Sequence, residues 1–386
     1  MDRRAVAGGI AVAGVYTLAI LLEHHGVRSA AHGADVSLYE TDARAIAHGS
    51  LPYRDLYFEY PPGALPPILA PEPASAYATA FKALMAVLGV GCLVGAAVVL
   101  RAEGRRMLVP LLAIAVAPVA VGSVFVNRFD LWPALLAVIA VALLVRGRPT
   151  AAFVFLALGA TAQVWPAAAI PAAAVWVFRR YGSTALRRAL TAFVATGLVV
   201  LLPFAAVGPG GLRFSFTIQL TRHLQTESLG GAILLAADRL GIYHATIATG
   251  KPGSLDLFGT LPTAVGALSL VAVVALIAWG AWMNTDSIVV AVAAAVAVYV
   301  AFGKVLSPQY LVWLVPLVPL ARRHVATALL LVALVLTQIE FDHRYHELHT
   351  AGPVVWILLA RDLCLVAVAA VLVSACRPAT ASRRTP

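Results

Sequence analysis

Residues 75 to 100 read SAYATAFKALMAVLGVGCLVGAAVVL, a run in which Lys82 is the single charged residue. An α-helix rises about 1.5 Å per residue, so roughly 20 apolar residues are enough to cross the hydrocarbon core of a bilayer. The run is longer than that and carries almost no charge. It therefore predicts a transmembrane helix.

The composition of the whole chain supports the same prediction. Of the 386 residues, 61% are hydrophobic and 12% are charged, whereas about a quarter of the residues in a soluble domain are charged. The formal charge of +10 comes from basic residues in short runs between apolar segments. Anionic lipid explains such runs better than nucleic acid does. We therefore expect an all-α membrane protein that contacts membrane lipids and binds no nucleic acid.

Apolar stretches recur along the chain, and we count twelve predicted spans, some short enough that ten or eleven is an alternative. They cover roughly residues 5 to 22, 75 to 100, 107 to 125, 131 to 145, 150 to 164, 166 to 178, 189 to 206, 261 to 282, 286 to 303, 308 to 320, 324 to 339 and 353 to 375. A signal peptide is the alternative for the first stretch, but its length favours an anchor. We expect one membrane-embedded domain over residues 1 to 386, with large loops at about 23 to 75 and 207 to 260 that contain juxtamembrane helices.

The charges between the spans predict an orientation. With the N-terminus in the cytoplasm, the basic runs fall on the cytoplasmic side, as the positive-inside rule requires. These runs are Arg3-Arg4, Arg101 to Arg106, Arg146 to Arg148, Arg179 to Arg188, Arg322-Arg323 and Arg377 to Arg384. Most acidic residues and histidines then fall outside, which indicates a working surface there, unless the outer loops are simply longer. We predict a multi-pass cell-membrane protein with both termini in the cytoplasm and its active site on the extracytoplasmic face.

The first large loop contains a predicted helix over residues 35 to 48, ended by Gly49 and Pro52. Asp35 and Asp42 lie at the margin of its apolar face, about 10.5 Å apart along the axis. That is too far for the carboxyl pair of a glycoside hydrolase. Transfer from a sugar phosphate needs only one base, because phosphate leaves without an acid. The structural alternatives are a helix cap for Asp35 and a solvated helix face for Asp42.

The same loop continues with the aromatic segment Tyr53 to Pro62. Aromatic residues and prolines here are typical of an interfacial anchor that stops before the next helix. Glu59 fits that interpretation less well, because a carboxylate beside the acyl region is costly unless it is paired or hydrated. Glu59 and its neighbour Tyr60 are therefore candidate site residues.

Four segments spread over most of the chain carry a family resemblance. They are Asp35 to Tyr39 with Ala45 to Gly49, Pro52-Tyr53 and Tyr60-Pro61-Pro62 in the first loop, Asn127 to Pro133, Gln219 to Leu229, and Ser307 to Leu311. In order and loop placement they resemble the family 87 glycosyltransferases, which use polyprenyl-phosphate-mannose. The resemblance implies a helical bundle of the GT-C type, an outer-face cavity, and a lipid-linked donor that enters from the membrane. It also implies that Asp35 is the general base, with Asp42 and Glu59 as alternatives.

A lipid phosphate donor needs cations near the outer surface. The predicted topology places Arg128, Arg222, His223, Arg239 and Lys304 there. Arg222 is the first choice for the phosphate. Each of these side chains has an alternative role in reaching lipid headgroups, and Arg128 has a second one in neutralising Asp130. Gln309 and Tyr310 follow a proline that breaks the helix, and they are candidates to hold sugar hydroxyls; a purely structural helix break is the alternative.

No metal or cofactor is expected. His343, His346 and His349 have i, i+3 spacing, but a surface helix is the simpler interpretation because supporting ligands of a zinc site are not evident. The sequence contains no P-loop or glycine-rich phosphate loop. Three cysteines lie in or beside apolar stretches without CxxC spacing, and we expect them to be core thiols that form no disulfide; they are Cys92, Cys364 and Cys376.

These observations predict an integral membrane glycosyltransferase of the cell envelope. It would transfer a hexose, with mannose the expected sugar, from a polyprenyl-phosphate donor to an extracytoplasmic glycolipid or polysaccharide. A single base without a covalent intermediate favours inversion of the anomeric centre. A transporter or flippase of lipid-linked saccharides is the alternative, although it would place polar residues deep in the spans. A non-catalytic membrane subunit is the third possibility.

Overall fold

The computed structural model describes residues 3–22, 34–250, 254–283 and 287–376, and these residues are mostly helical. The α-helices are α1 Arg3–Leu21, α2 Ala34–Ala47, α3 Leu65–Leu69, α4 Tyr77–Ala102, α5 Leu108–Ala115, α6 Ala117–Val121, α7 Leu131–Val145, α8 Pro149–Ala162, α9 Ile170–Val207, α10 Pro209–Thr221, α11 Leu229–Arg239, α12 Thr260–Met283, α13 Ile288–Phe302, α14 Tyr310–Leu314, α15 His324–Arg344 and α16 Val355–Ser374. Short 3-10 helices are η2 Pro62–Ala64, η3 Gly122–Phe125, η4 Trp165–Ala169, η5 Pro319–Ala321 and η6 Tyr345–Thr350. The predicted all-α polytopic bundle is confirmed.

Within the described ranges, 6 helical segments are long and apolar enough to cross a membrane. They are Tyr77–Ala102, Leu108–Phe125, Trp165–Val207, Thr260–Met283, His324–Phe341 and Val355–Ser374. Shorter apolar helices cover Val6–Leu21, Leu131–Val145, Pro149–Ala162, Ile288–Phe302 and Tyr310–Ala321. Each of these segments overlaps at least one predicted span. A helix of 15 residues such as α13 is about 22 Å long, which explains why the shorter ones do not meet a full-span criterion.

One predicted break between spans is a kink instead of a loop. We expected separate helices at 166 to 178 and 189 to 206, and the range Ile170–Val207, labelled α9, contains two helices that meet at a kink without a loop between them. Inside it, Gly182 has φ 81° and ψ −180°, which is not helical. Glycine adopts this conformation without the penalty that a Cβ atom imposes. The basic segment 179 to 188 is therefore helical on both sides of the kink at Gly182.

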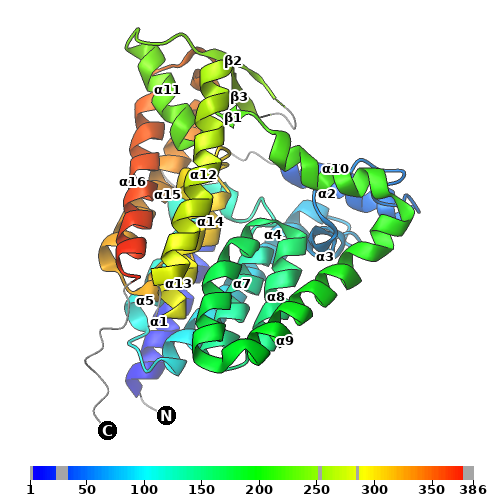
Figure 1. Ribbon diagram of the computed structural model, residues 1–386, viewed down its shortest axis with the longest axis vertical. Helices are drawn as coiled ribbons and strands as arrows, with labels where there is room; N and C mark the ends of the chain where they lie inside the picture. Colours follow the sequence, from blue (N-terminus) through cyan, green and yellow to red (C-terminus); the bar gives the residue numbers. More distant parts are fainter. Residues whose placement is uncertain (1–2, 23–33, 251–253, 284–286, 377–386) are drawn as a thin grey trace.

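Helix α13 lies at the centre of the bundle. Nearly all of its side chains are buried, and it packs against α7, α9, α12 and α16. A helix that is apolar on every side is expected in such a position. Around it, α15 packs on α16, and α4, α7, α8 and α9 pack in sequence. Figure 1 shows the first turn of α1 and the last turn of α16 at the same end of the bundle.

The opposite end carries the two large loops, with α2, α10, α11 and a small sheet (Figure 1). The sheet has the order β1-β3-β2 and is antiparallel; its strands are β1 Leu224–Gln225, β2 Thr246–Thr249 and β3 Leu255–Phe258. It was not predicted. The backbone N–H of Gln225 donates to the carbonyl of Lys304 over 3.0 Å. The sheet therefore ties the second loop to the segment between α13 and α14.

Close backbone packing fixes the first loop against the bundle. The indole of Trp132 donates to the carbonyl of Gly63 over 3.0 Å. A Cβ on Gly63 would lie 2.6 Å from backbone atoms of Thr161 and Ala162, and a Cβ on Gly211 would overlap the carbonyl group of Tyr53. These glycines permit the loop to lie directly on α8 and α10. The first loop is thereby held against the bundle.

Candidate functional site

A cavity of about 440 Å³ lies where the two large loops meet the ends of the central helices. Its lining residues are Asp35, Leu38, Glu59, Tyr60, Pro61, Arg128, Gln163, Val164, Trp165, Ser215, Arg222, Gln225, Glu227, Ser254, Tyr299, Ser307, Gln309, Tyr310, Trp313, Phe341 and Tyr345. They come from segments far apart in the sequence, and they include carboxylates, guanidinium groups, amides, hydroxyls and aromatic rings. Such a mixture in one concavity is typical of a substrate site.

Asp35 forms an ion pair with Arg128 at one wall of this cavity. Helix α2 begins at Ala34, so Asp35 lies in its first turn, where the helix dipole favours a negative charge. Arg128 lies in the turn between η3 and α7 and is 13% exposed. Burial lowers the pKa of Arg128 to about 10, against the charges of Asp130 and Glu227, which raise it. Arg128 therefore remains a cation at neutral pH.

Asp130 interacts with the charge of Arg128, which is the alternative role considered for that arginine, and it also has hydrogen-bond partners of its own. The buried Asp130 carboxylate accepts hydrogen bonds from the Trp313 indole at 2.6 Å and from the Gln163 amide at 3.1 Å. Gln163 in turn accepts from the Trp165 indole at 3.0 Å. Burial raises the pKa of Asp130 to about 6, and these hydrogen bonds lower it. Asp130 thus fixes the side chains that form the cavity floor.

Aromatic rings form that floor. Trp165 and Trp313 stack with ring centroids 4.8 Å apart, and Tyr310 also stacks on Trp313, with centroids 4.0 Å apart. The side chain of Gln309, the neighbour of Tyr310, accepts a hydrogen bond from Ser307 at 2.6 Å. Gln309 and Tyr310, the predicted sugar-holding pair, both line the cavity.

Arg222 follows the last residue of α10 and also lines the cavity. Glu59 and Tyr60 line it from the first loop. Burial raises the pKa of Glu59, whereas its hydrogen bond with Tyr60 and the charge of Arg222 lower it. The ring of Tyr60 packs edge-to-face against the ring of Phe129, with centroids 4.9 Å apart. Glu59 is therefore a carboxyl group of the cavity that interacts with the neighbouring Tyr60 through a hydrogen bond and with the charge of Arg222.

Two predicted substrate-binding residues do not line the cavity. The ring of His223 packs against Phe258 with centroids 4.3 Å apart. The ammonium group of Lys304 donates to the carbonyl of Leu220 over 2.8 Å. Both residues lie beside Arg222 or the sheet. The cavity therefore brings together Asp35, Glu59, Tyr60, Arg128, Arg222, Gln309 and Tyr310 of the predicted set.

Asp42 is not on a solvated helix face, as the simplest interpretation of its position suggested. It is 5% exposed, and burial together with the charge of Glu59 raises its pKa to about 6. It is not among the cavity-lining residues. Asp42 is therefore a buried helical carboxyl group outside the cavity lining.

Sequence reasoning missed the deepest polar residues near the cavity. Arg361 and Asp362 lie in α16, Glu340 lies in α15, and all are buried. Glu227, which lies within the Gln219 to Leu229 motif, lines the cavity. The available signal was an Arg-Asp pair inside an apolar span, which is costly unless it has partners.

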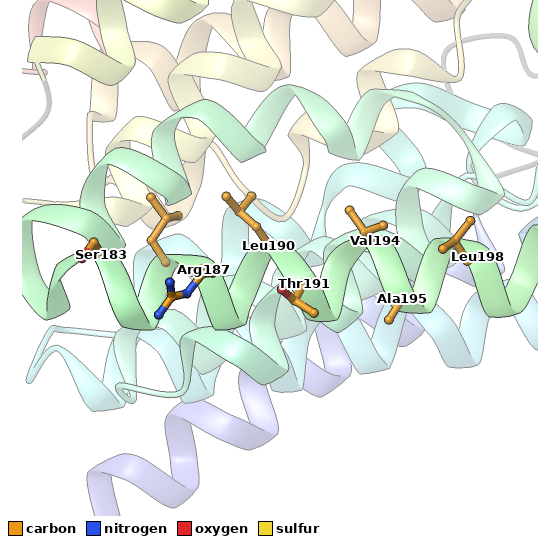
Figure 2. A pocket seen from close by; sticks show the side chains of 8 residues that line it. Ser183, Arg187, Leu190, Thr191, Val194, Ala195 and Leu198 are labelled. Atoms are coloured by element: carbon orange, nitrogen blue, oxygen red, sulfur yellow. The ribbon is translucent and has the colours of Figure 1, made fainter.

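The described residues contain no group of three or more His, Cys, Asp or Glu placed to hold a metal ion. The three cysteines are free, with Cys92 and Cys376 buried and Cys364 half-buried. A second hollow, of about 570 Å³, is lined by residues of α9 alone. Figure 2 shows them along one face of that helix, and they are mostly apolar. Such a face suits lipid better than a charged substrate.

The comparisons with known proteins agree with the resemblance drawn from the motifs. The family model of glycosyltransferase family 87 matches residues 57–308. The match includes Glu59, Arg128, Arg222 and Glu227, and it begins after Asp35. No curated protein and no solved structure gives a significant match. Because the family model covers more than half of the chain, this protein belongs to glycosyltransferase family 87.

Proposed function

We propose that this membrane glycosyltransferase transfers a hexose, with mannose the expected sugar, from a polyprenyl-phosphate donor to an extracytoplasmic glycolipid or polysaccharide. The observation that carries the proposal is the shared cavity of Asp35, Arg128 and Arg222 in a chain of this family. A carboxylate can take a proton there, and two guanidinium groups can hold a phosphate.

In the proposed reaction, Asp35 accepts the proton of the acceptor hydroxyl as its oxygen attacks the anomeric carbon of the donor. The bond between that carbon and the phosphate oxygen breaks, and its electron pair leaves with the phosphate. Arg222 and Arg128 offset the growing negative charge. One displacement without a covalent intermediate inverts the anomeric configuration.

The ion pair between Asp35 and Arg128 supports this division of roles. A neighbouring cation favours the ionised form of a carboxyl group, which is the form a base requires. The guanidinium group has more donors than one carboxylate uses, so Arg128 can contact the donor phosphate and Asp35 together. Arg128 would thereby connect the base, on the acceptor side of the anomeric carbon, with the leaving phosphate on the opposite side.

The orientation belongs to the same proposal, with both termini in the cytoplasm and the cavity on the outer side. Two observations support it. The basic residues are concentrated in the loops assigned to the cytoplasm, and the first turn of α1 and the last turn of α16 lie at the end of the bundle opposite the two large loops (Figure 1). Single cysteines introduced at exposed Thr246 or Arg105, in a cysteine-free variant, test it. A membrane-impermeant maleimide should label position 246 in intact cells and position 105 only after lysis. The reverse pattern would contradict the orientation.

A flippase would need polar residues along a path through the spans, and Arg361 and Asp362 are polar residues in such a position. They bind each other, Glu340 and the backbone of Glu227. All three guanidinium nitrogens of Arg361 and one carboxylate oxygen of Asp362 are used within the protein, which favours a structural cluster over a transport path.

The donor class is tested with purified protein and two labelled donors, polyprenyl-phospho-mannose and a nucleotide-linked mannose. Membranes of cells that make the protein supply the acceptor. We expect label in product only from the lipid donor, and a product anomer opposite to that of the donor. Transfer from the nucleotide sugar alone would overturn the donor assignment, and a retained anomer would overturn the single-base mechanism.

A further inference from the structure

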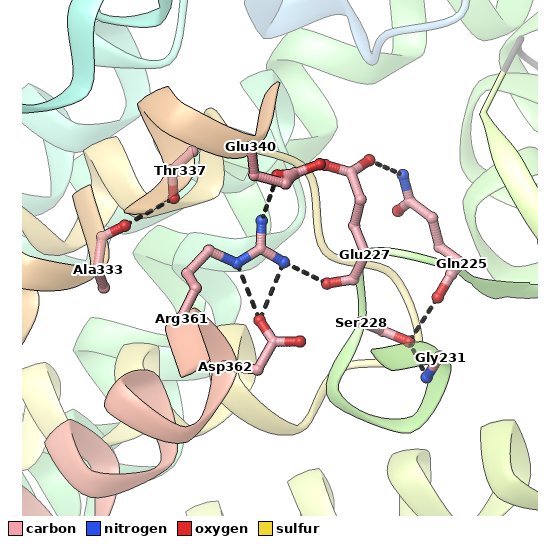
Figure 3. Close-up of polar contacts among 9 residues, drawn as sticks. All are labelled: Gln225, Glu227, Ser228, Gly231, Ala333, Thr337, Glu340, Arg361 and Asp362. Atoms are coloured by element: carbon pink, nitrogen blue, oxygen red, sulfur yellow. Dashed lines mark hydrogen bonds and ion pairs between the residues drawn. The ribbon is translucent and has the colours of Figure 1, made fainter. Parts of the chain in front are cut away.

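A buried ionic cluster includes Glu227, one of the residues that line the cavity (Figure 3). Arg361 donates to Asp362 at 2.9 Å and to Glu340 at 3.2 Å. Its remaining nitrogen donates to the backbone carbonyl of Glu227 at 2.5 Å. The four residues are 0 to 2% exposed. Arg361 therefore positions the segment that carries Glu227 into the cavity wall.

The cluster contains more acids than bases. Three carboxyl groups, from Glu227, Glu340 and Asp362, surround the single guanidinium group of Arg361. Ionised carboxylates in such a position are costly unless each has a partner. Arg361 contacts the carboxylates of Asp362 and Glu340, but it contacts Glu227 only through the backbone. The Glu227 carboxyl group is thus not hydrogen-bonded to the guanidinium group of Arg361.

One oxygen of Glu227 accepts a hydrogen bond from Gln225 at 2.9 Å, and the other has no donor among the described residues. Figure 3 shows the carboxyl groups of Glu227 and Glu340 pointing toward each other. Two ionised carboxylates in this arrangement repel each other, and one proton between them removes the repulsion. No metal-holding group of acids is found in the described residues to serve instead.

We propose that Glu227 is a neutral carboxyl group that shares its proton with Glu340, and that this neutrality lets the cavity accept the anionic phosphate of its substrate. The identity of the substrate rests on the proposed function. The net charge of the cavity-lining side chains explains why a neutral Glu227 would favour binding of an anion. Three acids, Asp35, Glu59 and Glu227, face two bases, Arg128 and Arg222, so full ionisation gives 2 − 3 = −1. A neutral Glu227 brings the sum to zero.

Electrostatic surroundings agree with this protonation. Burial and the charge of Glu340 raise the pKa of Glu227 well above its usual range; the charge of Arg361 lowers it, that of Asp362 raises it, and that of Arg222 lowers it. Glu227 also acts on titratable groups of other elements, which are Arg128, Tyr310 and Tyr345. The proton belongs to the Glu227–Glu340 pair, which titrates as a unit.

The experiment measures binding without transfer. Full-length protein in nanodiscs is titrated with polyprenyl methyl phosphate, a diester without a second titrating proton, between about pH 6 and pH 9. We expect the Kd of the wild type to rise by up to about tenfold per pH unit once the pair loses its proton. Glu227→Gln should bind the diester as tightly as the wild type does at low pH, and its Kd should stay constant.

Glu340→Gln is the matched variant, because it removes one carboxylate from the same cluster. The amide at 340 relieves the repulsion and can donate to Glu227, so Glu227 ionises and binding weakens already at neutral pH. Opposite effects of the two variants support the inference. Equal effects, or a pH dependence that persists in Glu227→Gln, would overturn it. Asp55→Asn, at an exposed carboxylate, should behave as the wild type.

This assay separates the inference from the donor assignment. If the protein transfers no mannose but binds the diester with the expected pH pattern, the inference about the shared proton stands and the assignment of mannose as the sugar is wrong. If the protein transfers mannose but the two variants bind the diester alike, the proposed enzymatic function stands and the shared proton is wrong.

Discussion

The indole N–H of Trp313 donates a 2.6 Å hydrogen bond to Asp130, a residue 183 positions earlier in the chain. The same carboxylate oxygen accepts from Gln163, which accepts from Trp165. One buried oxygen therefore joins the turn before α7, the end of α8, η4 and α14. The cavity floor is a single unit and not a set of independent side chains.

Replacing Asp130 should separate two chemical properties of that oxygen. Asp130→Asn keeps an acceptor at the same position, so we expect little change in stability. Asp130→Leu leaves two buried donors without a partner, at a cost of about 1–3 kcal/mol each. Thermal melting in detergent, followed by tryptophan fluorescence, should show a clear loss only for leucine. Equal losses for both variants would mean that the charge, and not the acceptor, matters.

Two adjacent glycines of α10 provide a matched pair. A Cβ on Gly211 would overlap the carbonyl of Tyr53, whereas a Cβ on Gly210 meets nothing within 4 Å. Gly211→Ala should therefore displace the first loop and destabilise by about 1–3 kcal/mol. Gly210→Ala should be neutral or stabilise by up to about 1 kcal/mol, because alanine favours helix. Melting temperatures and limited proteolysis of the first loop measure both, and a destabilising Gly210→Ala would refute the packing argument.

The helices of this fold were accessible from sequence because apolar length is a direct signal. The loop helix expected at 35 to 48 lies at Ala34–Ala47. The small sheet was not accessible, because strands of 2 to 4 residues are too short to show periodicity. The Gly182 kink was missed because a glycine in the sequence permits unusual φ and ψ angles but does not indicate which angles the backbone adopts.

The candidate site was accessible in part. Loop position and the family motifs pointed to Asp35, Arg128 and Arg222, which do line one cavity. Their partners were not accessible, because a hydrogen bond such as that between Asp130 and Trp313 depends on the three-dimensional path of the chain. The assigned roles of these residues remain predictions.

Removing Arg361 should be among the most damaging single changes. Its guanidinium group is fully buried and serves Asp362, Glu340 and the Glu227 backbone. Breaking a buried ion pair on one side typically costs about 3–5 kcal/mol. Arg361→Leu should therefore lower the melting temperature strongly, whereas Arg54→Leu, at an exposed ion pair, should change it little. Similar melting curves for both variants would contradict the buried cluster.

The pH dependence of stability should reveal Asp42. Burial, with the charge of Glu59, raises its folded-state pKa to about 6, above the unfolded value of about 3.9. The protonated form is favoured in the fold, so its contribution is complete below the unfolded pKa and is lost as pH rises through 6. The stability of the wild type relative to Asp42→Asn should fall between about pH 4 and pH 6 and then stay level. Melting temperatures of both proteins across this range measure it; a difference independent of pH would be inconsistent with a buried carboxyl.

The comparison of Asp35→Asn with Asp42→Asn tests the proposed base directly. Asp35 lines the cavity beside Arg128, whereas Asp42 is buried outside it. Removing a general base typically lowers the rate by about 10² to 10⁴. Asp35→Asn should therefore lose nearly all transfer while it still binds the lipid donor, and Asp42→Asn should keep most of its activity.

The two variants also distinguish chemistry from folding, because each asparagine preserves the shape of the side chain it replaces. Melting temperature and donor binding of Asp35→Asn should stay close to those of the wild type, since Arg128 can still bond to the amide oxygen. If Asp35→Asn instead unfolds at a lower temperature while each folded molecule stays active, Asp35 supports only the first turn of α2. If Glu59→Gln or Asp42→Asn is the inactive variant, the proton acceptor is that residue, and the cavity and family assignment still stand.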